Sequence, residues 1–131
     1  MTAEEQVPKA TVNSISTNDD GMGICVWVDF TGTGEGSKAL LDTGAGISIL
    51  PRRIFDAVNR QRYVRLRASD KKVRGANSKS IECFGMAWVE VEIEKERFKH
   101  RFYVCQDNVN VLLGRDFMKK AKISLEPAKI K

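Results

Sequence analysis

The chain of 131 residues is long enough for one domain with its own core and too short for two. A hydrophobic content of 42% is ordinary for a globular protein. No stretch approaches the roughly 18 apolar residues that a membrane-spanning helix needs, and the first residues lack the basic start and apolar run of a signal peptide. These features predict a single soluble domain with no membrane partner.

Cysteine and histidine content argues against a metal site. Cys25, Cys83 and Cys105 form no Cys-x-x-Cys pair, so we expect reduced thiols rather than a disulfide framework or a zinc knuckle. His100 is the single histidine, in phase with Phe98 and Phe102, and we interpret it as a strand-face residue rather than a catalytic base. A Cys-His nucleophilic pair stays open, with no local support.

The first half of the chain reads as strands and turns. Residues 1–20 are polar and predict a flexible arm or linker, followed by one domain over residues 21–131. Residues 24–30 and 38–41 predict strands joined by a glycine-rich hairpin turn at 31–36, whose spacing is not that of a phosphate-binding loop. Residues 52–60 predict a short helix, and 64–66 another strand.

The second half continues the same pattern. Residues 73–81 predict a strand, a turn and a strand, with Asn77 and Ser78 as turn formers. Residues 87–93 alternate cleanly, 94–97 turn the chain, and 98–104 return with Phe98, Phe102 and Val104 toward the core. We expect further strands at 109–113 and 123–125 and a helix at 114–121. The predicted class is mainly β, with a barrel-like fold.

The most informative stretch is Asp42-Thr43-Gly44, which follows an apolar strand. We expect Gly44 to adopt backbone angles that a side chain would oppose, and the Thr43 hydroxyl to lock the turn. A chance tripeptide would only end a strand. Because leucines precede this turn and an apolar segment at 47–50 follows it, the context favours a catalytic carboxylate.

A second motif runs from Val111 to Met118, as Val-Leu-Leu-Gly-Arg-Asp-Phe-Met. Together with residues 40–50 it resembles the retropepsin family, the aspartic proteases of retroviruses and LTR retrotransposons. The resemblance covers roughly residues 23–125, and Pro51 with the Gly-Arg-Asp-Phe-Met ending is most similar to Ty3/gypsy-type enzymes. It implies a retropepsin-like acid protease fold with a closed barrel-like half, a flap hairpin and a short C-terminal helix, and no cofactor or metal.

A peptide-cleaving aspartic site needs two carboxylates, and the chain has one Asp-Thr-Gly. Two copies must therefore meet, with Asp42 of each across a two-fold axis, so the expected enzyme is a homodimer. Two carboxylates about 3 Å apart do not both ionise, and the pair shares one proton. We expect one member to activate water and the other to donate to the scissile carbonyl, with a mildly acidic optimum.

The resemblance also implies roles for single residues. Thr43 would brace the two active turns, and Gly44 and Ala45 would contact substrate. The flap and a pocket wall would come from Gly75, Ala76, Asn77, Ser78 and Leu112, while Leu113 is interpreted as core. In the family Arg115 pairs with a carboxylate two residues beyond the turn glycine, which here is Gly46, so Asp116 or a carboxylate of the other chain is the expected substitute.

The resulting interpretation is an aspartic endopeptidase that processes a retroelement polyprotein, in the cytoplasm or within retroelement particles. One alternative is a non-catalytic dimerisation or peptide-binding module. Another is a basic nucleic-acid-binding barrel, because the net charge of +5 is concentrated at residues 60–67 and 71–72. A solvated face is the preferred interpretation of that run, with salt-sensitive attraction to nucleic acid as the alternative.

Overall fold

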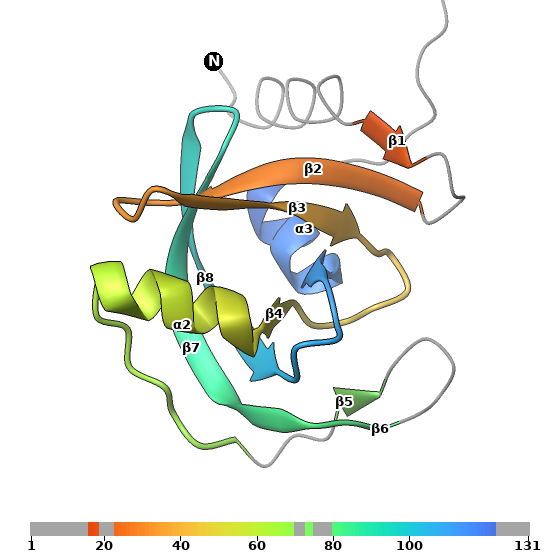
Figure 1. Ribbon diagram of the computed structural model, residues 1–131. Coiled ribbons are helices and arrows are strands. Elements are labelled where there is room, and N and C mark those ends of the chain that lie inside the picture. Colours follow the sequence, from red (N-terminus) through yellow and green to blue (C-terminus); the bar gives the residue numbers. More distant parts are fainter. Residues whose placement is uncertain (1–15, 19–22, 70–72, 75–79, 123–131) are drawn as a thin grey trace, which may run out of the picture.

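A computed structural model describes residues 16–18, 23–69, 73–74 and 80–122, which fold mainly into β-strands (Figure 1). The elements are β1 (Ser16–Asn18), β2 (Gly23–Phe30), β3 (Glu35–Leu41), β4 (Ile49–Pro51), α2 (Arg52–Gln61), β5 (Val73–Arg74), β6 (Ser80–Ile81), β7 (Cys83–Ile93), β8 (Glu96–Cys105), β9 (Val111–Leu113) and α3 (Arg115–Ala121). Within these residues, neither helix has the length and apolar character that crossing a membrane requires.

Six strands close into a barrel. The main sheet has the order β1-β2-β3-β9-β4-β8-β7, and β7 also pairs with β2, which joins the two ends of the sheet. The closing contacts are Asp29 with Glu92 and Phe30 with Val91. Strand β1 pairs with the first residues of β2, at Cys25, Ile24 and Gly23. The predicted mainly β, barrel-like fold is therefore confirmed.

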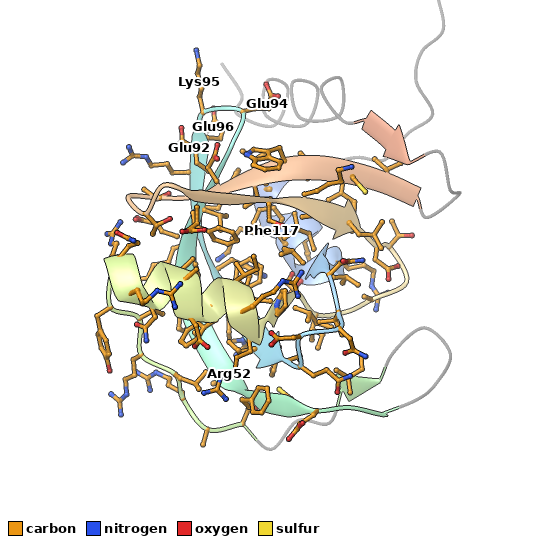
Figure 2. The ribbon with its side chains drawn as sticks, in the orientation of Figure 1. Arg52, Glu92, Glu94, Lys95, Glu96 and Phe117 are labelled. Carbon is orange, nitrogen blue, oxygen red and sulfur yellow. The ribbon has the colours of Figure 1, made fainter. Side chains whose placement is uncertain are left out.

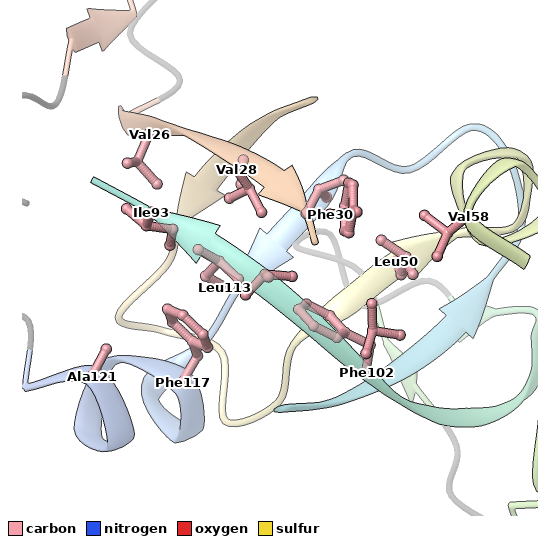
Figure 3. Packing of buried hydrophobic residues seen from close by; sticks show 14 of the residues in the cluster. Val26, Val28, Phe30, Leu50, Val58, Ile93, Phe102, Leu113, Phe117 and Ala121 are labelled. Atoms are coloured by element: carbon pink, nitrogen blue, oxygen red, sulfur yellow. The ribbon is translucent and has the colours of Figure 1, made fainter. Parts of the chain in front are cut away.

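The interior of the barrel is filled by alternate residues of the strands and by both helices (Figure 3). Burial of a valine, leucine, isoleucine or phenylalanine side chain contributes about 1.5–3 kcal/mol to folding stability relative to exposure. Helix α3 supplies the ring of Phe117, which is fully buried and points into the interior (Figure 2). The largest fully buried side chains are Phe30, Phe102, Phe117, Leu50, Ile93, Leu113, Val28, Val89, Val91, Val104 and Val111.

The turn between β7 and β8 is tight and charged. Glu94 and Lys95 both have left-handed φ values, 53° and 70°, as a two-residue hairpin turn requires. The side chains of Glu92, Glu94, Lys95 and Glu96 gather at this end of the hairpin, away from the barrel interior (Figure 2). Glu92, Glu94 and Glu96 thus place acidic side chains at this tip, whereas Glu90 lies farther back along β7.

One expected strand is wrong. Val64 and Leu66 pack against the core, as their alternation predicts, but residues 63–66 form no strand. The N–H of Val64 donates instead to the side chain of Asn59 on α2, at 2.7 Å. Only Arg67 reaches β7, as an isolated bridge to Met86. The helix holds the beginning of this segment, and its backbone therefore does not follow the sheet.

The other expected elements within the described residues are present with shifted ends, including the helix at Arg52–Gln61 and the helix at Arg115–Ala121. The expected strand at 123–125 and the flap residues Gly75, Ala76, Asn77 and Ser78 lie outside the described residues. Ser16–Asn18, within the range expected to be an arm, pair with β2.

Candidate active site

Asp42 lies where two parallel strands end together. Strand β3 pairs in parallel with β9, with Leu41 beside Leu113, and the N–H of Asp42 donates to the carbonyl of Leu113 at 3.0 Å. The chain leaves β3 into the turn that carries Asp42, and it leaves β9 into helix α3. The two sequence motifs are therefore brought into contact at one end of the barrel.

The carboxylate of Asp42 organises its own turn. Asp42 Oδ1 accepts the N–H of Gly44 at 2.8 Å, and the backbone carbonyl of Asp42 accepts the N–H of Ala45 at 3.2 Å. Two expectations fail here. Gly44 does not have a left-handed φ, and the Thr43 hydroxyl makes no hydrogen bond to any described residue. Gly44 instead leaves room for the carboxylate, because a Cβ there would lie 3.2 Å from Asp42 Oδ1.

Gly114 and Arg115 brace this turn from the other motif. The N–H of Arg115 donates to the carbonyl of Ala45 at 2.7 Å, and its Nη1 donates to the carbonyl of Thr43 at 2.8 Å. A Cβ on Gly114 would lie 2.2 Å from the carbonyl oxygen of Ile47. Backbone approaches backbone here so closely that a side chain is excluded, which explains the glycine of the second motif.

Asp116 is not the partner of Arg115, contrary to one expectation. Its Oδ1 accepts the hydroxyl of buried Ser48 at 2.8 Å, and Ser48 Oγ in turn accepts the N–H of Gly114 at 3.1 Å. The Arg115 side chain donates instead to the carbonyl of Thr43, with its Nη2 close to Gly46. Ser48 and Asp116 thus connect the two motifs beneath the turn. The signal for Ser48 in the sequence is a single hydroxyl within an apolar segment.

His100 is buried on the other side of Asp116. Its Nε2 lies 3.0 Å from Asp116 Oδ2, although neither ring nitrogen has the geometry of a directed hydrogen bond. The ring packs edge-on against Phe102 and Phe117. Burial lowers the pKa of His100 from its ordinary value of 6.5, and this effect outweighs the attraction of Asp116. His100 is thus a buried strand residue, as expected from its phase.

The cysteines do not form a nucleophilic centre with His100. Cys25, Cys83 and Cys105 are free thiols. Burial, with a smaller effect of the neighbouring Cys83, raises the pKa of Cys105 to about 12, so this thiol stays neutral at physiological pH and is a poor nucleophile. Among the described residues, no three His, Cys, Asp or Glu side chains are grouped so as to hold a metal ion.

A second apolar cluster lies next to the turn. Leu112 is half-buried and packs against the buried cluster of Ile49, Tyr103 and Cys105, as do Ile47, just after the turn, and Ile81 of β6. Strands β5 and β6 pair antiparallel, Val73 with Ile81 and Arg74 with Ser80, as the two arms of the expected hairpin. Leu113, one residue on, is fully buried in the main core. Ile47 and Ile81 pack against this second cluster, and the sequence interpretation did not include them.

Comparison with known proteins agrees with this geometry. The chain is similar to the EIAV protease, solved in complex with the inhibitor HBY-793, with a TM-score of 0.64 and 23% identity over 86% of this chain and 100% of that chain. It is also similar to the retroviral protease-like domain of Ddi1 from Leishmania major, with a TM-score of 0.56 and 24% identity over 73% of this chain and 74% of that domain. Both likenesses concern the fold.

No curated protein sequence gives a significant match. A family model does: the one described as "gag-polyprotein putative aspartyl protease" matches residues 28–120, which include β3, the Asp42 turn, β9 and nearly all of α3. The chain therefore belongs to the gag-polyprotein aspartyl protease family and has the retropepsin fold.

Proposed function

We propose that the protein is an aspartic endopeptidase that acts as a homodimer and uses Asp42 of each subunit. The observation that carries this proposal is the placement of the Asp42 turn, which Gly114 and Arg115 hold through three backbone carbonyls: those of Ala45 and Thr43 by hydrogen bonds, and that of Ile47 by close packing. Such a rigid support holds a half-buried carboxylate in one position at the end of the barrel.

The chemistry follows from bringing two such turns together. Two carboxylates about 3 Å apart hold one proton between them, because both do not ionise at that separation. The ionised carboxylate takes a proton from a water molecule, and the protonated one donates to the carbonyl of the peptide bond. The product of this step is a tetrahedral gem-diol, whose collapse releases two peptides. Activity is expected to be highest at mildly acidic pH.

Further roles are assigned to the residues around the turn. Thr43 and Gly44 are exposed and are assigned to contact a second subunit or a substrate backbone, and Ala45 is assigned to the floor of the cleft. Leu112 is assigned to a pocket wall, and Ile47 and Ile81 are assigned to the same wall because they pack against the same apolar cluster. Gly75, Ala76, Asn77 and Ser78, which lie outside the described residues, are assigned to the flap that contacts a substrate bound in extended form.

The apolar character of this wall favours peptides with apolar side chains on both sides of the cut. The family of the chain favours a retroelement polyprotein as the substrate. On this proposal residues 1–20 are a polyprotein linker, residues 21–131 the protease domain, and the cytoplasm or the retroelement particle the place of action.

The test is cleavage of a peptide library between about pH 4 and about pH 7 at increasing protein concentration. The parent is compared with Asp42→Asn and with the control Asp56→Asn. Asp56 is a suitable control because it pairs with Arg52 on the surface of α2, at 3.7 Å, away from the turn. Cleavage that rises more steeply than linearly with concentration, and that is lost only in Asp42→Asn, supports the proposal.

Two other results would contradict it. Cleavage that persists in Asp42→Asn would mean that another group does the chemistry. Peptide binding without cleavage in the parent would mean that the fold serves as a binding or dimerisation module.

A further inference from the structure

A basic groove of about 650 Å³ lies on a different part of the barrel from Asp42. The groove is lined by residues 62–65 and Arg67, which follow helix α2, and by residues 88–90 of β7. Thr31 and Lys99 of β8 also line it. None of these residues belongs to the Asp42 turn. A volume in the range of ~300–1,000 Å³ is typical of ligand sites. The groove exists because residues 63–66 do not pair with β7, as described above.

The charge of the groove is not balanced within the groove. Arg62 is neutralised by Glu90, with Nη1 and Oε1 3.0 Å apart. Arg65, Arg67 and Lys99 are exposed, and in the part of the chain that the structure describes they form no ion pair. Among the described residues that line the groove, Glu90 is the acidic one and it pairs with Arg62, so an excess of three positive charges faces one opening. An anionic ligand is therefore favoured.

Exposed aromatic rings line the same groove. Among the described residues three large hydrophobic side chains are exposed, and two of them, Tyr63 at 80% and Trp88 at 45%, belong to it. The ammonium group of Lys120 lies 5.2 Å from the centre of the Trp88 ring and adds a further cation at the rim. Exposed rings interleaved with cations are the arrangement on which nucleic-acid bases stack while phosphates bind the cations.

Polar groups in this region also lack partners. Thr31 Oγ1 is buried without a hydrogen bond to any described residue. One edge of β7 pairs with β8, and the other edge faces the groove. On the edge that faces the groove, Met86 exchanges two backbone hydrogen bonds with Arg67, and the carbonyl of Glu90 accepts the N–H of Thr31. Backbone groups alternate between the two edges of a strand, so the N–H and carbonyl of Trp88, midway between these contacts, face the groove. They give a bound base a donor and an acceptor.

We propose that this groove binds single-stranded nucleic acid, with bases stacked on Tyr63 and Trp88 and phosphates held by Arg65, Arg67 and Lys99. An acidic peptide would match the cations and the open backbone groups. It would not use the two exposed rings, and for this reason the observations favour nucleic acid. The proposal concerns a face apart from Asp42 and does not depend on proteolytic activity.

The test is fluorescence anisotropy with labelled oligonucleotides of roughly 12 nucleotides, in a ribose and a deoxyribose version, and with an oligoglutamate peptide of the same length. Salt is varied from ~50 to ~200 mM, where contacts to three phosphates predict a slope of log affinity against log salt near about −2. The double variant R65Q/K99Q is expected to weaken oligonucleotide binding about tenfold or more.

Matched variants separate the groove from overall charge. The double variant K38Q/R60Q removes the same charge, and it includes a residue of the same basic run that does not line the groove. Tyr63→Ala is expected to weaken binding about fivefold or more through lost stacking, whereas Trp27→Ala, an exposed ring of β2 outside the groove, is expected to leave it unchanged. Asp42→Asn is expected to bind like the parent.

Three results would overturn the proposal. Equal losses in the two double variants would mean that only net charge attracts the oligonucleotide. Binding of oligoglutamate as tight as that of either oligonucleotide, with no effect of Tyr63→Ala, would identify an acidic-peptide site. No salt-dependent binding of any probe would leave the run at residues 60–67 as a solvated face. A difference between the ribose and deoxyribose probes would identify which nucleic acid the groove prefers.

Discussion

Close backbone approach is the feature that individual residues contribute to the candidate site. Gly114 lies close to the carbonyls of Ala45 and Ile47, and the hydroxyl oxygen of Ser48 accepts the N–H of Gly114. Such positions have no tolerance for an added atom, because the neighbours are backbone and do not rotate away. Glycine is thus required at position 114 because the backbone of the Asp42 turn leaves no space for a side chain.

Replacement of Gly114 by alanine is expected to displace the Asp42 turn. The added Cβ would lie 2.2 Å from the carbonyl oxygen of Ile47, so the turn must shift. We expect a loss of about 1–3 kcal/mol in the free energy of unfolding, measured by urea denaturation, together with loss of peptide cleavage. Gly46→Ala is the control, since its Cβ would meet only the end of the Arg115 side chain, at 3.3 Å. Equal effects in both variants would contradict this explanation.

The buried His100 gives the protein a predictable response to acid. Its pKa is lowered in the folded state by burial, so the folded protein keeps the ring neutral at a pH where the unfolded chain protonates it. This contribution to stability is complete above the ordinary value of 6.5 and is lost as the pH falls through the lower folded pKa. Urea denaturation between about pH 8 and about pH 5 should show the decline.

His100→Leu is the matched variant for this effect, because it keeps an apolar side chain beside Phe102 and Phe117. Its stability should fall less steeply with acid than that of the parent. A parallel decline in the two proteins would assign the acid sensitivity to other groups.

At the scale of elements, strand β9 has two faces with different tasks. Leu113 is fully buried in the main core, while its neighbour Leu112 is half-buried in the cluster with Ile47 and Ile81. Alternation along a strand places consecutive side chains on opposite faces. One strand of three residues therefore contributes both to the barrel interior and to the second apolar cluster.

Alanine substitution should separate these two tasks. Leu113→Ala is expected to cost about 2–5 kcal/mol of unfolding free energy, because it leaves a cavity in a closed core. Leu112→Ala is expected to cost about 1 kcal/mol and to change KM for peptides with large apolar side chains more than kcat. Denaturation and peptide kinetics on both variants provide the measurement. A larger stability loss for Leu112→Ala would reverse the assignment of the two faces.

Most elements were predictable from the sequence, because alternation and turn residues agree with the sheet over most of its length. The strand at 87–93 and the helix at 52–60 are examples, each with one clear apolar face. Residues 64–66 show where alternation is insufficient. They have the pattern of a strand, but the N–H of Val64 donates a hydrogen bond to the side chain of Asn59. Hydrophobic spacing does not predict such a local contact.

The site itself was predictable only in part. Asp42 and the second motif could be located from the residues and their family resemblance, and the structure brings them together. The bonding within the site was not predictable. The Arg115 side chain donates to a backbone carbonyl, an acceptor that every residue offers, and Asp116 accepts the hydroxyl of Ser48, which lies 68 residues away in the sequence.

For the whole molecule, the proposed function makes activity a property of two copies, because each chain has one Asp-Thr-Gly turn. If each site takes Asp42 from both subunits, an Asp42→Asn chain should lower the cleavage activity of the parent by forming inactive mixed dimers with it. With free exchange, an equal amount of Asp42→Asn should lower activity to about half, and a ninefold excess to about a tenth, at fixed parent concentration. The measurement is peptide cleavage after mixing, with an unrelated protein as the control additive. Activity that does not change would show that one chain holds a complete site.

The distance along the chain between the turn and its brace has a consequence for the timing of synthesis. Arg115 lies 72 residues after Thr43, whose carbonyl it binds, and Asp116 lies 68 after Ser48. Such non-local pairs form late in folding, because a long loop must close before they contribute. On the ribosome Asp42-Thr43-Gly44 therefore emerges well before the residues that hold it in place. A growing chain thus carries the Asp42 carboxylate without this support until Arg115 and Asp116 have been made.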